Sequence, residues 1–319
     1  MKLALALGLA AVVLSGCAGA PTVAGSAPPA TGRASKPAQA GGSVTGAPAR
    51  PPKAGTVTKV LTFIEENHSL TQMKTGMPYL YSLAQRYAYA DHYTALTHPS
   101  EPNYLAIGFG STMGQTSDHR HAQDLPGATV FGQTIRAGKS ARVYQESMPS
   151  SCELDAAPPY YPKHNPWAQA ADERSMCAAD DVPMGSTSSG RLASDVSAGT
   201  LPNVGLAVPN QNNDAHDGSL GEADTWLRDW LATVLAGPDY RSGHLAIVVT
   251  ADEDDRTSGN TVLTTVLHPA LNGAHRVVST ALNHYSLSRL NAQATCTPPL
   301  RNAASAPDMA AAFTLTTPC

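Results

Sequence analysis

Apolar runs of strand length alternate along this chain with runs of helical periodicity. The clearest strand is residues 245–250, Leu-Ala-Ile-Val-Val-Thr, and residues 222–235 repeat their apolar side chains at helical spacing. The same patterns predict strands at 57–64, 141–145, 203–208 and 261–267, helices at 78–87 and 129–137, and an irregular segment at 147–200. This alternation is typical of an α/β fold, with a mostly parallel central sheet flanked by helices on both faces.

Polar clusters follow three of these strands at the point where each strand ends. They are Glu65-Glu66-Asn67-His68-Ser69 after the first strand, Asp214, His216 and Asp217 after the strand at 203–208, and Asp252 to Asp255 after the strand at 245–250. Open α/β sheets bind ligands beyond the carboxyl ends of their strands, and carboxylate, amide and imidazole groups hold divalent cations. The clusters therefore predict a cation site at this edge. Taken singly, a capping turn after the first strand and a solvated acidic loop after residue 251 stay open as alternatives.

Ser100 lies in Thr-His-Pro-Ser-Glu-Pro, just before a run of small and apolar residues. A serine followed two positions later by a proline, Pro102, predicts the N-cap of a helix with proline in its first turn. The free N–H groups and the dipole of a helix N-terminus attract anions. A serine there, beside a divalent cation, could lose its proton and attack phosphorus. The residues alone leave both a plain cap and a nucleophile open.

Short motifs in a fixed order extend this pattern along the chain. They are ENHS at 66–69, THPSEPNYLA at 97–106, YQESMP at 144–149, VPN to NDAHD across 208–217, VVTADEDD at 248–255 and NHYSL at 283–287. In this order they resemble the bacterial phosphoesterase family that contains acid phosphatases and non-haemolytic phospholipases C, within the alkaline-phosphatase superfamily. The resemblance spans about residues 57–290 and implies an alkaline-phosphatase-like fold.

The resemblance implies a metal site at the strand ends. Its ligands would be Glu66, Asn67, Ser100, Asp214, Asp252 and Glu253. Ser100 would also be the nucleophile, and the Asn67 amide would point at a phosphate oxygen. Related enzymes of the superfamily carry Asp-His where this chain has Asp252-Glu253, so the glutamate implies an oxygen-rich site rather than a classical zinc pair. The implied cofactor is a divalent metal cation whose identity the residues leave open.

Histidines complete the implied chemistry. Asp214 and His216 match a region that supplies metal ligands or a proton donor, and His284 matches a late histidine that reaches the same site. His98 lies next to the nucleophile motif and could orient a phosphate. A plain loop position for His216 and a helix start for His284 stay open as alternatives. The sequence patterns assign no catalytic or binding role to His164.

The implied function is metal-dependent hydrolysis of phosphate esters through a serine nucleophile, as in acid phosphatases. A phosphoseryl intermediate would form on Ser100, and His216 or His284 would protonate the leaving alkoxide or activate water. One alternative is a phospholipase C acting on phospholipid head groups, a type with additional C-terminal domains, whereas this chain ends soon after NHYSL. Another is a non-catalytic surface lipoprotein that binds phosphate or metal. A sulfatase is disfavoured because HPSEPN lacks the arginine of the sulfatase motif.

The N-terminal residues are typical of an export signal. Lys2 precedes an apolar run, Leu3 to Leu14, that is too short to span a bilayer as a mature helix. The run ends in Leu-Ser-Gly-Cys17 and resembles a bacterial lipoprotein signal, residues 1–16, with lipid on Cys17. An ordinary secretory signal with a chance cysteine is the alternative. Residues 17–55, rich in Ala, Gly, Pro and Ser, predict a disordered tether before a phosphoesterase domain at 56–319. We therefore expect an exported lipoprotein of the cell membrane that faces the outside, at the cell surface or in the periplasm.

The remaining cysteines are Cys152, Cys177, Cys296 and Cys319. In an exported protein their even number predicts disulfides, and three pairings are possible. Pairing between sequence neighbours would join the first two and the last two. A zinc site is the weaker reading because no CxxC spacing occurs. The formal net charge of −4 includes no basic field, so nucleic acid is not an expected partner.

Overall fold

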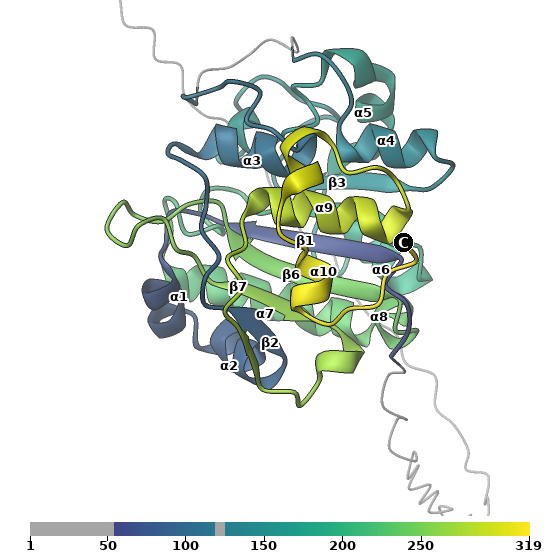
Figure 1. Cartoon of the computed structure of the whole chain (residues 1–319). Helices are drawn as coiled ribbons and strands as arrows, with labels where there is room; N and C mark the ends of the chain where they lie inside the picture. Colours follow the sequence, from purple (N-terminus) through teal and green to yellow (C-terminus); the bar gives the residue numbers. More distant parts are fainter. Residues whose placement is uncertain (1–53, 119–124) are drawn as a thin grey trace, which may run out of the picture. The chain divides into compact units, whose positions relative to one another are not determined.

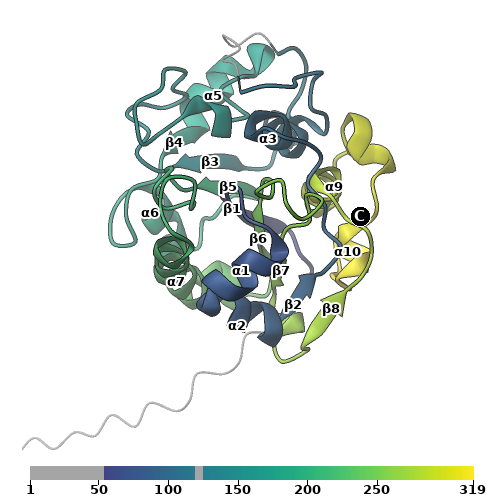
Figure 2. The same cartoon turned by 90° about the vertical axis from the view of Figure 1, so that its left-hand side faces the viewer.

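The computed structural model describes residues 54–118 and 125–319. The predicted signal peptide, Cys17 and nearly all of the predicted tether lie outside the described residues. In this part of the chain, eight strands form one sheet in the order β4-β3-β5-β1-β6-β7-β2-β8 (Figures 1 and 2). Their bounds are β1 Lys59–Glu65, β2 Ala88–Ala90, β3 Ala141–Gln145, β4 Asp181–Pro183, β5 Val204–Val208, β6 Leu245–Ala251, β7 Thr264–Leu267 and β8 Arg276–Val278.

Strand β1 lies inside the sheet, parallel to both of its neighbours. Leu61 pairs with Gly205 of β5 on one side and with Ile247 of β6 on the other. Strand β7 runs antiparallel to β6 and β2, so the sheet is mixed but mostly parallel. Strands β5 and β6 are buried throughout, which explains their continuous apolar runs. The carboxyl ends of three adjacent strands, β5, β1 and β6, therefore share one edge of the sheet.

The helices are mostly short. Their bounds are α1 Leu70–Gly76, α2 Pro78–Arg86, α3 Ser100–Phe109, α4 Val130–Arg136, α5 Arg174–Asp180, α6 Arg191–Ala198, α7 Leu220–Ala236, α8 Pro238–Arg241, α9 His284–Thr295 and α10 Met309–Ala312, with a 3-10 turn η1 at Pro162–His164. The longest, α7, begins with a capping box in which Ser219 and Glu222 each accept a backbone N–H. Of the helices in the described ranges, none has both the length and the apolar character needed to cross a membrane.

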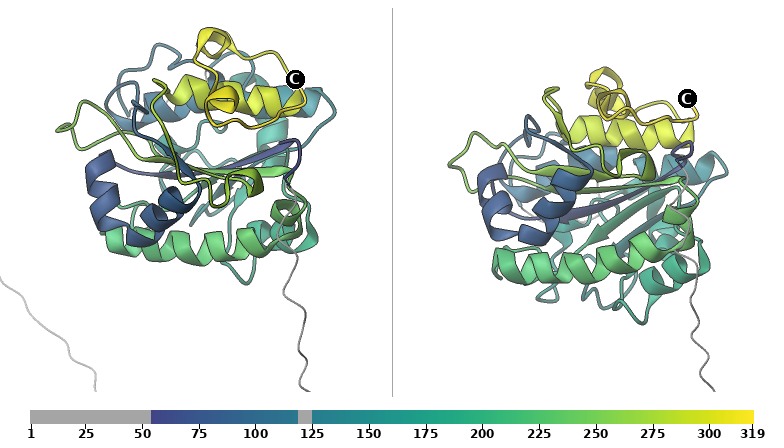
Figure 3. Two further views of the ribbon diagram at one scale, coloured as in Figure 1. Left: turned by 60° about the horizontal axis from the view of Figure 1, so that its bottom comes forward. Right: turned by 90° about the horizontal axis from the view of Figure 1, so that it is seen from below.

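Helices cover both faces of the sheet. Helices α3, α4 and α9 lie over one face, and α1, α2 and α7 lie over the other (Figures 1 and 3). Helix α9 packs on β1 and β5 from the first side. From the second side, Trp226 of α7 meets Phe63 of β1 edge-on, with ring centroids 6.1 Å apart. The predicted α/β fold, a mostly parallel sheet with helices on both faces, is confirmed.

The expectation of an irregular segment at 147–200 is wrong. The segment contains α5, β4 and α6, and β4 extends the sheet beside β3. A disulfide joins Cys152 to Cys177, and Asn165 Nδ2 donates to Asp181 Oδ2 at 2.7 Å. These tertiary links stabilise short elements that lack a long apolar repeat, so the sequence pattern did not reveal them.

Both disulfides join sequence neighbours. Cys152 pairs with Cys177, and Cys296 pairs with Cys319. Of the three pairings that the sequence left open, the structure has the local one. The second disulfide ties Cys319 to Cys296, the C-cap of α9. It therefore fixes the last stretch of chain to a helix that packs on the central strand.

Replacing Asp181 by asparagine is expected to flatten the pH dependence of stability. Burial raises the pKa of Asp181 to about 8, although the Asn165 amide acts to lower it. The folded chain keeps this proton until about pH 8, whereas the unfolded chain loses it near pH 4, so the contribution to stability falls as pH rises between these values. Between pH 5 and 8, the unfolding free energy of the unsubstituted chain should fall by about 4 kcal/mol more than that of Asp181→Asn, as measured by urea unfolding. Asp229→Asn removes an exposed carboxylate as the control, and equal pH slopes for the unsubstituted chain and Asp181→Asn would contradict the prediction.

Candidate active site

The carboxyl ends of β1, β5 and β6 bring the predicted polar clusters together. Glu66 follows β1, Asp214 follows β5 and Asp252 follows β6. The Glu66 N–H donates to the Asp214 carbonyl at 2.8 Å, and the Asp252 N–H donates to the Glu65 carbonyl at 3.0 Å. Glu66, Asp214 and Asp252 are fully buried, so they are not part of a solvated acidic loop.

Glu66, Asp214 and His164 form a compact group. Each can offer one ligand atom, and these atoms lie within 4.8 Å of one another. His164 Nε2 contacts Glu66 Oε1, and His164 Nδ1 lies 3.8 Å from Asp214 Oδ2. The His164 ring stacks on Tyr104 of α3, with ring centroids 4.9 Å apart. The group could hold a metal ion, and it includes His164, which the sequence patterns did not assign.

The donor atoms of this edge fit a cation. Apart from the His164 contact to Glu66, neither Glu66 oxygen has a hydrogen-bond partner within residues 54–118 and 125–319, and the same holds for Asp214 Oδ2 and Asp252 Oδ2. Buried carboxylate oxygens without partners are costly, and a bound cation would remove that cost. Carboxylate oxygens with one imidazole are ligands typical of divalent metal ions. The residues present therefore fit the predicted cofactor.

Charge crowding sets the protonation of these acids. Burial, with the Glu66 charge second, raises the pKa of both Asp214 and Asp252 well above its usual range. Burial also acts to raise the pKa of Glu66, but nearby basic groups, led by His164, outweigh it and lower that pKa to about 2. Glu66 is therefore ionised, while its neighbours tend to keep protons that a bound cation would displace.

Ser100 is the first residue of α3 and not its N-cap. The N-cap is Pro99, so the predicted cap is one residue off. The Ser100 side chain lies close to Asp252 instead, where its hydroxyl acts to lower the pKa of that carboxyl. Ser100 is 2% exposed. The plain-cap interpretation therefore does not fit, because the hydroxyl lies against the acidic group rather than against a backbone N–H of its own helix.

The Asp252 carboxylate is fixed by two backbone N–H groups. Its Oδ1 accepts from the Asn67 N–H at 3.3 Å and from the Glu253 N–H at 2.7 Å. Asn67 has a φ of 54°, in the left-handed region that asparagine tolerates better than most residues. This turn at the end of β1 aims the Asn67 N–H at Asp252. Asn67, Ser100 and Asp252, all predicted ligands, therefore lie in one place.

Glu253 faces side chains of the protein. Its Oε2 accepts from Asn103 Nδ2 at 3.2 Å, and its Oε1 lies 3.2 Å from His98 Nδ1. Burial, with the Glu66 charge second, raises the pKa of Glu253 to about 8. The other ring nitrogen of His98 lies 3.2 Å from Asp254 Oδ1. His98 is thus engaged by two carboxylates and fixes the acidic loop, and this geometry does not aim its ring at a phosphate.

The two predicted catalytic histidines differ in environment. His284 is fully buried, with Nε2 at 2.7 Å from the Asp252 carbonyl and Nδ1 at 3.1 Å from the Tyr93 hydroxyl. Both of its ring nitrogens are occupied, and burial lowers its pKa to about 4. The side chain of His216 is 31% exposed, with Nε2 at 3.9 Å from Glu66 Oε2 and Nδ1 at 2.8 Å from Asp217. His216 is therefore accessible to solvent beside Glu66, whereas His284 is buried against the Asp252 carbonyl.

Lys163 and Asp118 also lie at this edge, and the sequence patterns assigned neither. Lys163 Nζ is 4.0 Å from Glu66 Oε2 and 3.5 Å from Asp118 Oδ2. Lys163 and His164 are both in η1, inside the segment that was expected to be irregular. The adjacent basic pair Lys-His is the sequence signal that could have drawn attention to it. The Lys163 ammonium group, which lies between the Glu66 and Asp118 carboxylates, is suited to binding an anionic ligand.

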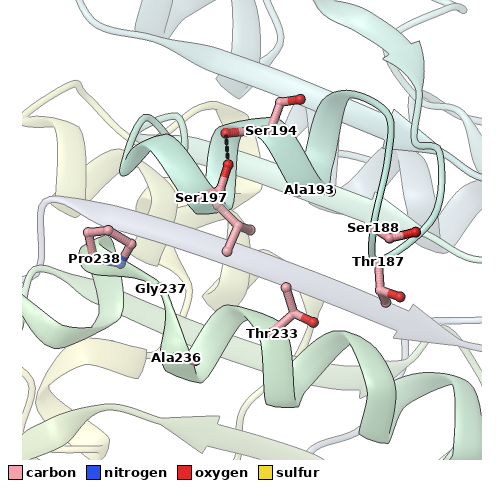
Figure 4. A pocket seen from close by; sticks show the side chains of 10 residues that line it. Thr187, Ser188, Ala193, Ser194, Ser197, Thr233, Ala236, Gly237 and Pro238 are labelled. Carbon is pink, nitrogen blue, oxygen red and sulfur yellow. Dashed lines mark hydrogen bonds between the residues drawn. The ribbon is translucent and has the colours of Figure 1, made fainter. Parts of the chain in front are cut away.

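Two of the hollows in the described part of the chain differ in the side chains that line them. One of about 170 Å³ adjoins the acidic edge and is lined by Glu101, Asp118, Ala156, Tyr161, Pro162 and Lys163. Another of about 420 Å³ lies between α6 and the α7–α8 corner, where small side chains such as Ser194, Ser197 and Thr233 line it (Figure 4). This larger hollow contains none of the acidic or histidine side chains of the strand ends. We therefore locate the candidate site by its acidic and histidine side chains and not by the volume of the hollow.

Comparisons with known proteins show the family of the chain. The chain matches the model of the Phosphoesterase family over residues 58–287, which include every acidic and histidine residue described above. It is 29% identical over 238 residues to a phosphatidylinositol-3-phosphatase of Mycobacterium tuberculosis, covering 73% of this chain and 75% of that protein. It is 28% identical over 190 residues to an acid phosphatase of Aspergillus fumigatus, covering 55% of this chain. The chain covers only 40% of that fungal protein.

Solved structures share the fold at low sequence identity. A phosphonate monoester hydrolase from Silicibacter pomeroyi superposes with a TM-score of 0.53 at 12% identity, covering 82% of this chain and 77% of that one. A protein of the alkaline phosphatase superfamily from Vibrio parahaemolyticus superposes with a TM-score of 0.52 at 11% identity, covering 81% and 72%. The predicted alkaline-phosphatase-like fold is confirmed.

Proposed function

The chain belongs to the Phosphoesterase family and is a phosphoric ester hydrolase, and from that premise we propose that it cleaves phosphate monoesters through Ser100 at a metal-dependent site. One observation carries the proposal. The buried Ser100 side chain, at the start of α3, lies close to the Asp252 carboxylate and beside the Glu66–His164–Asp214 group. A nucleophile, a cation-binding group and a helix N-terminus thus meet at one point, which is the arrangement that phosphoryl transfer needs.

The metal would be held by Glu66, Asp214 and Asp252, with His164 beside them. A bound divalent cation supplies positive charge that lowers the pKa of a nearby hydroxyl and offsets the charge on phosphoryl oxygens. Asn67, Ser100 and Glu253 complete the predicted ligand set. Glu253 is held by the protein on both carboxylate oxygens, which makes it the member least ready to bind an ion.

Each side chain of the site has a distinct part in the proposed reaction. Asp252 accepts the proton of the Ser100 hydroxyl as Ser100 Oγ attacks phosphorus and the bond to the leaving oxygen breaks. The product on the enzyme is a phosphoseryl ester. His216, partly exposed and held by Asp217, donates a proton to the leaving alkoxide and then takes one from the attacking water. When water later attacks phosphorus, the bond from phosphorus to Ser100 Oγ breaks, Asp252 returns the proton to Ser100, and inorganic phosphate leaves. His284 fixes the Asp252 carbonyl and transfers no proton to the substrate.

Monoesters are the favoured substrate class. The similar proteins of M. tuberculosis and A. fumigatus are named as phosphatases, whose substrates are monoesters. This supports an acid-phosphatase-like enzyme over a phospholipase C. We also propose that the chain is exported and anchored by lipid at Cys17, with residues 17–55 as the tether of the domain at 56–319. The two disulfides support export, since disulfides persist in oxidising compartments.

Assays of the full chain with three chromogenic esters test this function. We expect release of p-nitrophenol from p-nitrophenyl phosphate, with slower release from p-nitrophenyl phosphorylcholine and none from p-nitrophenyl sulfate. A chelator should reduce the rate by about 10²-fold or more, and a divalent metal should restore it. Preference for the phosphorylcholine ester would favour a phospholipase C instead. If no ester is cleaved but metal raises the melting temperature, the non-catalytic binding protein is favoured.

A further inference from the structure

The carboxylate of Asp118 occupies an anion-binding position beside the nucleophile. Asp118 Oδ1 accepts the backbone N–H of Glu101 at 2.9 Å, and Asp118 Oδ2 lies 3.5 Å from Lys163 Nζ. Glu101 directly follows Ser100, so this N–H belongs to the first turn of α3, where no carbonyl of the helix itself can accept it. One carboxylate thus bridges a helix N-terminus and a lysine, the two kinds of group that bind phosphate in proteins.

Lys163 is held firmly in this position. Its side chain is 15% exposed. Three hydrogen bonds fix the turn η1 that carries it. Gln145 Nε2 donates to the His164 carbonyl at 3.1 Å. The Pro162 carbonyl accepts from Gln169 Nε2 at 3.2 Å and from the Asn165 N–H at 3.0 Å. The ammonium group therefore needs no rearrangement to meet an anion at Asp118.

The acidic residues around Ser100 explain why a substrate phosphate needs positively charged groups at this position. Glu66 lies 4.0 Å from Lys163 Nζ, and Asp252 and Glu253 follow on the next strand end. A phosphate that approaches Ser100 meets these acids, so it needs positive groups on its own side of the site. The Lys163 ammonium and the Glu101 N–H are such groups. They do not depend on the metal, since both belong to the chain.

We propose that the Glu101 N–H and Lys163 Nζ form the subsite for the substrate phosphate, and that Asp118 fills this subsite as an internal competitor until phosphate displaces it. The inference rests on the proposed function, because the phosphate must lie next to Ser100. The hollow of about 170 Å³ at this point supports it. Lys163, Glu101 and Asp118 line its polar part, and Tyr161 and Pro162 give an apolar wall for the organic group of the ester.

Displacement of Asp118 is physically reasonable. Its side chain is 30% exposed, so the carboxylate can turn into water without being buried elsewhere. A phosphate dianion carries more charge and more acceptor oxygens than a carboxylate, and it should win the competition when its concentration is sufficient. While Asp118 remains bound, the apparent affinity for phosphate is reduced by the fraction of time that the subsite is filled. Removal of the competitor should therefore raise the affinity.

Substitutions with opposite expected signs test the subsite. Asp118→Ala should lower both the KM for p-nitrophenyl phosphate and the inhibition constant of inorganic phosphate by about three- to tenfold. Lys163→Met should raise both by about tenfold or more. Asp229→Asn and Lys139→Met remove single exposed charges of the same sign elsewhere and should change neither constant by more than about twofold. If Asp118 only caps α3 or orients Lys163, then Asp118→Ala will raise both constants, and that result overturns the proposal.

Two further measurements keep the test independent of folding and of turnover. Asp118→Asn retains an acceptor for the Glu101 N–H, so it should preserve the melting temperature and lower the inhibition constant less than alanine does. The rise in melting temperature on adding inorganic phosphate should be larger for Asp118→Ala than for the unsubstituted chain, and lost in Lys163→Met. This phosphate effect needs no catalysis, so it tests the subsite even if no ester is cleaved. Equal phosphate effects in all three proteins would overturn the subsite.

Discussion

Replacing Ser100 by alanine is expected to reduce kcat for p-nitrophenyl phosphate by about 10³-fold or more, because alanine lacks the hydroxyl that is proposed to attack phosphorus. Stability should change little. The hydroxyl contacts the Asp252 carboxylate, and that carboxylate keeps its two backbone N–H donors from Asn67 and Glu253. The melting temperature should therefore remain within a few degrees of the unsubstituted value. Metal should still raise it, because the Glu66–His164–Asp214 group is intact in the variant.

A matched serine substitution controls for this result. Ser82 is exposed on α2, on the face of the sheet opposite α3 (Figure 1), and its hydroxyl donates to the Tyr79 carbonyl at 2.7 Å. Ser82→Ala should retain the full rate. Acid quenching during turnover should leave phosphate on the peptide that contains Ser100, detectable by mass spectrometry, and Ser100→Ala should show none. A Ser100→Ala variant with the unsubstituted rate would show that another group attacks phosphorus.

Replacing Asp214 by asparagine is expected to reduce metal affinity by about 10²-fold or more without destabilising the metal-free protein. The two effects separate because burial and the Glu66 charge raise the pKa of Asp214, so the metal-free fold already favours a neutral side chain there. Asparagine also keeps an oxygen to accept the His216 N–H, which Asp214 Oδ1 accepts at 2.8 Å. Calorimetric titration of the chelated protein with a divalent metal measures the first effect, and melting temperatures in chelator measure the second.

Two further variants sharpen the metal test. Asp229→Asn removes an exposed carboxylate and should bind metal as the unsubstituted chain does. His164→Ala removes the group that the sequence patterns did not assign, and it should lose metal affinity by a similar factor if His164 is a ligand. If Asp214→Asn and His164→Ala both keep full metal affinity, the ion is bound elsewhere, and the site residues at the strand ends have another role.

Much of the fold was predictable because its signals are local. The strands β1, β5 and β6 are buried on both faces, so each reads as a continuous apolar run, and their ends are marked by sudden polarity. Parallel strands place their carboxyl ends together, which predicted that Glu66, Asp214 and Asp252 would meet before any contact was known. The elements between residues 147 and 200 were missed because a disulfide and side-chain hydrogen bonds hold them in place of a long apolar face.

The sequence by itself determined the sheet, the edge at which the site lies and the acidic residues that meet there, since each depends on periodicity or on strand direction. The choice of Ser100 depended instead on the resemblance of its motif to the phosphoesterase family. Only the tertiary structure decided that His164 joins the acidic group, that His284 faces inward to the Asp252 carbonyl, and that Asp118 meets the Glu101 N–H. These contacts join residues from separate segments through side-chain packing. A contact of this kind leaves no repeat in the chain, because its distance and its burial arise only when the segments fold against one another.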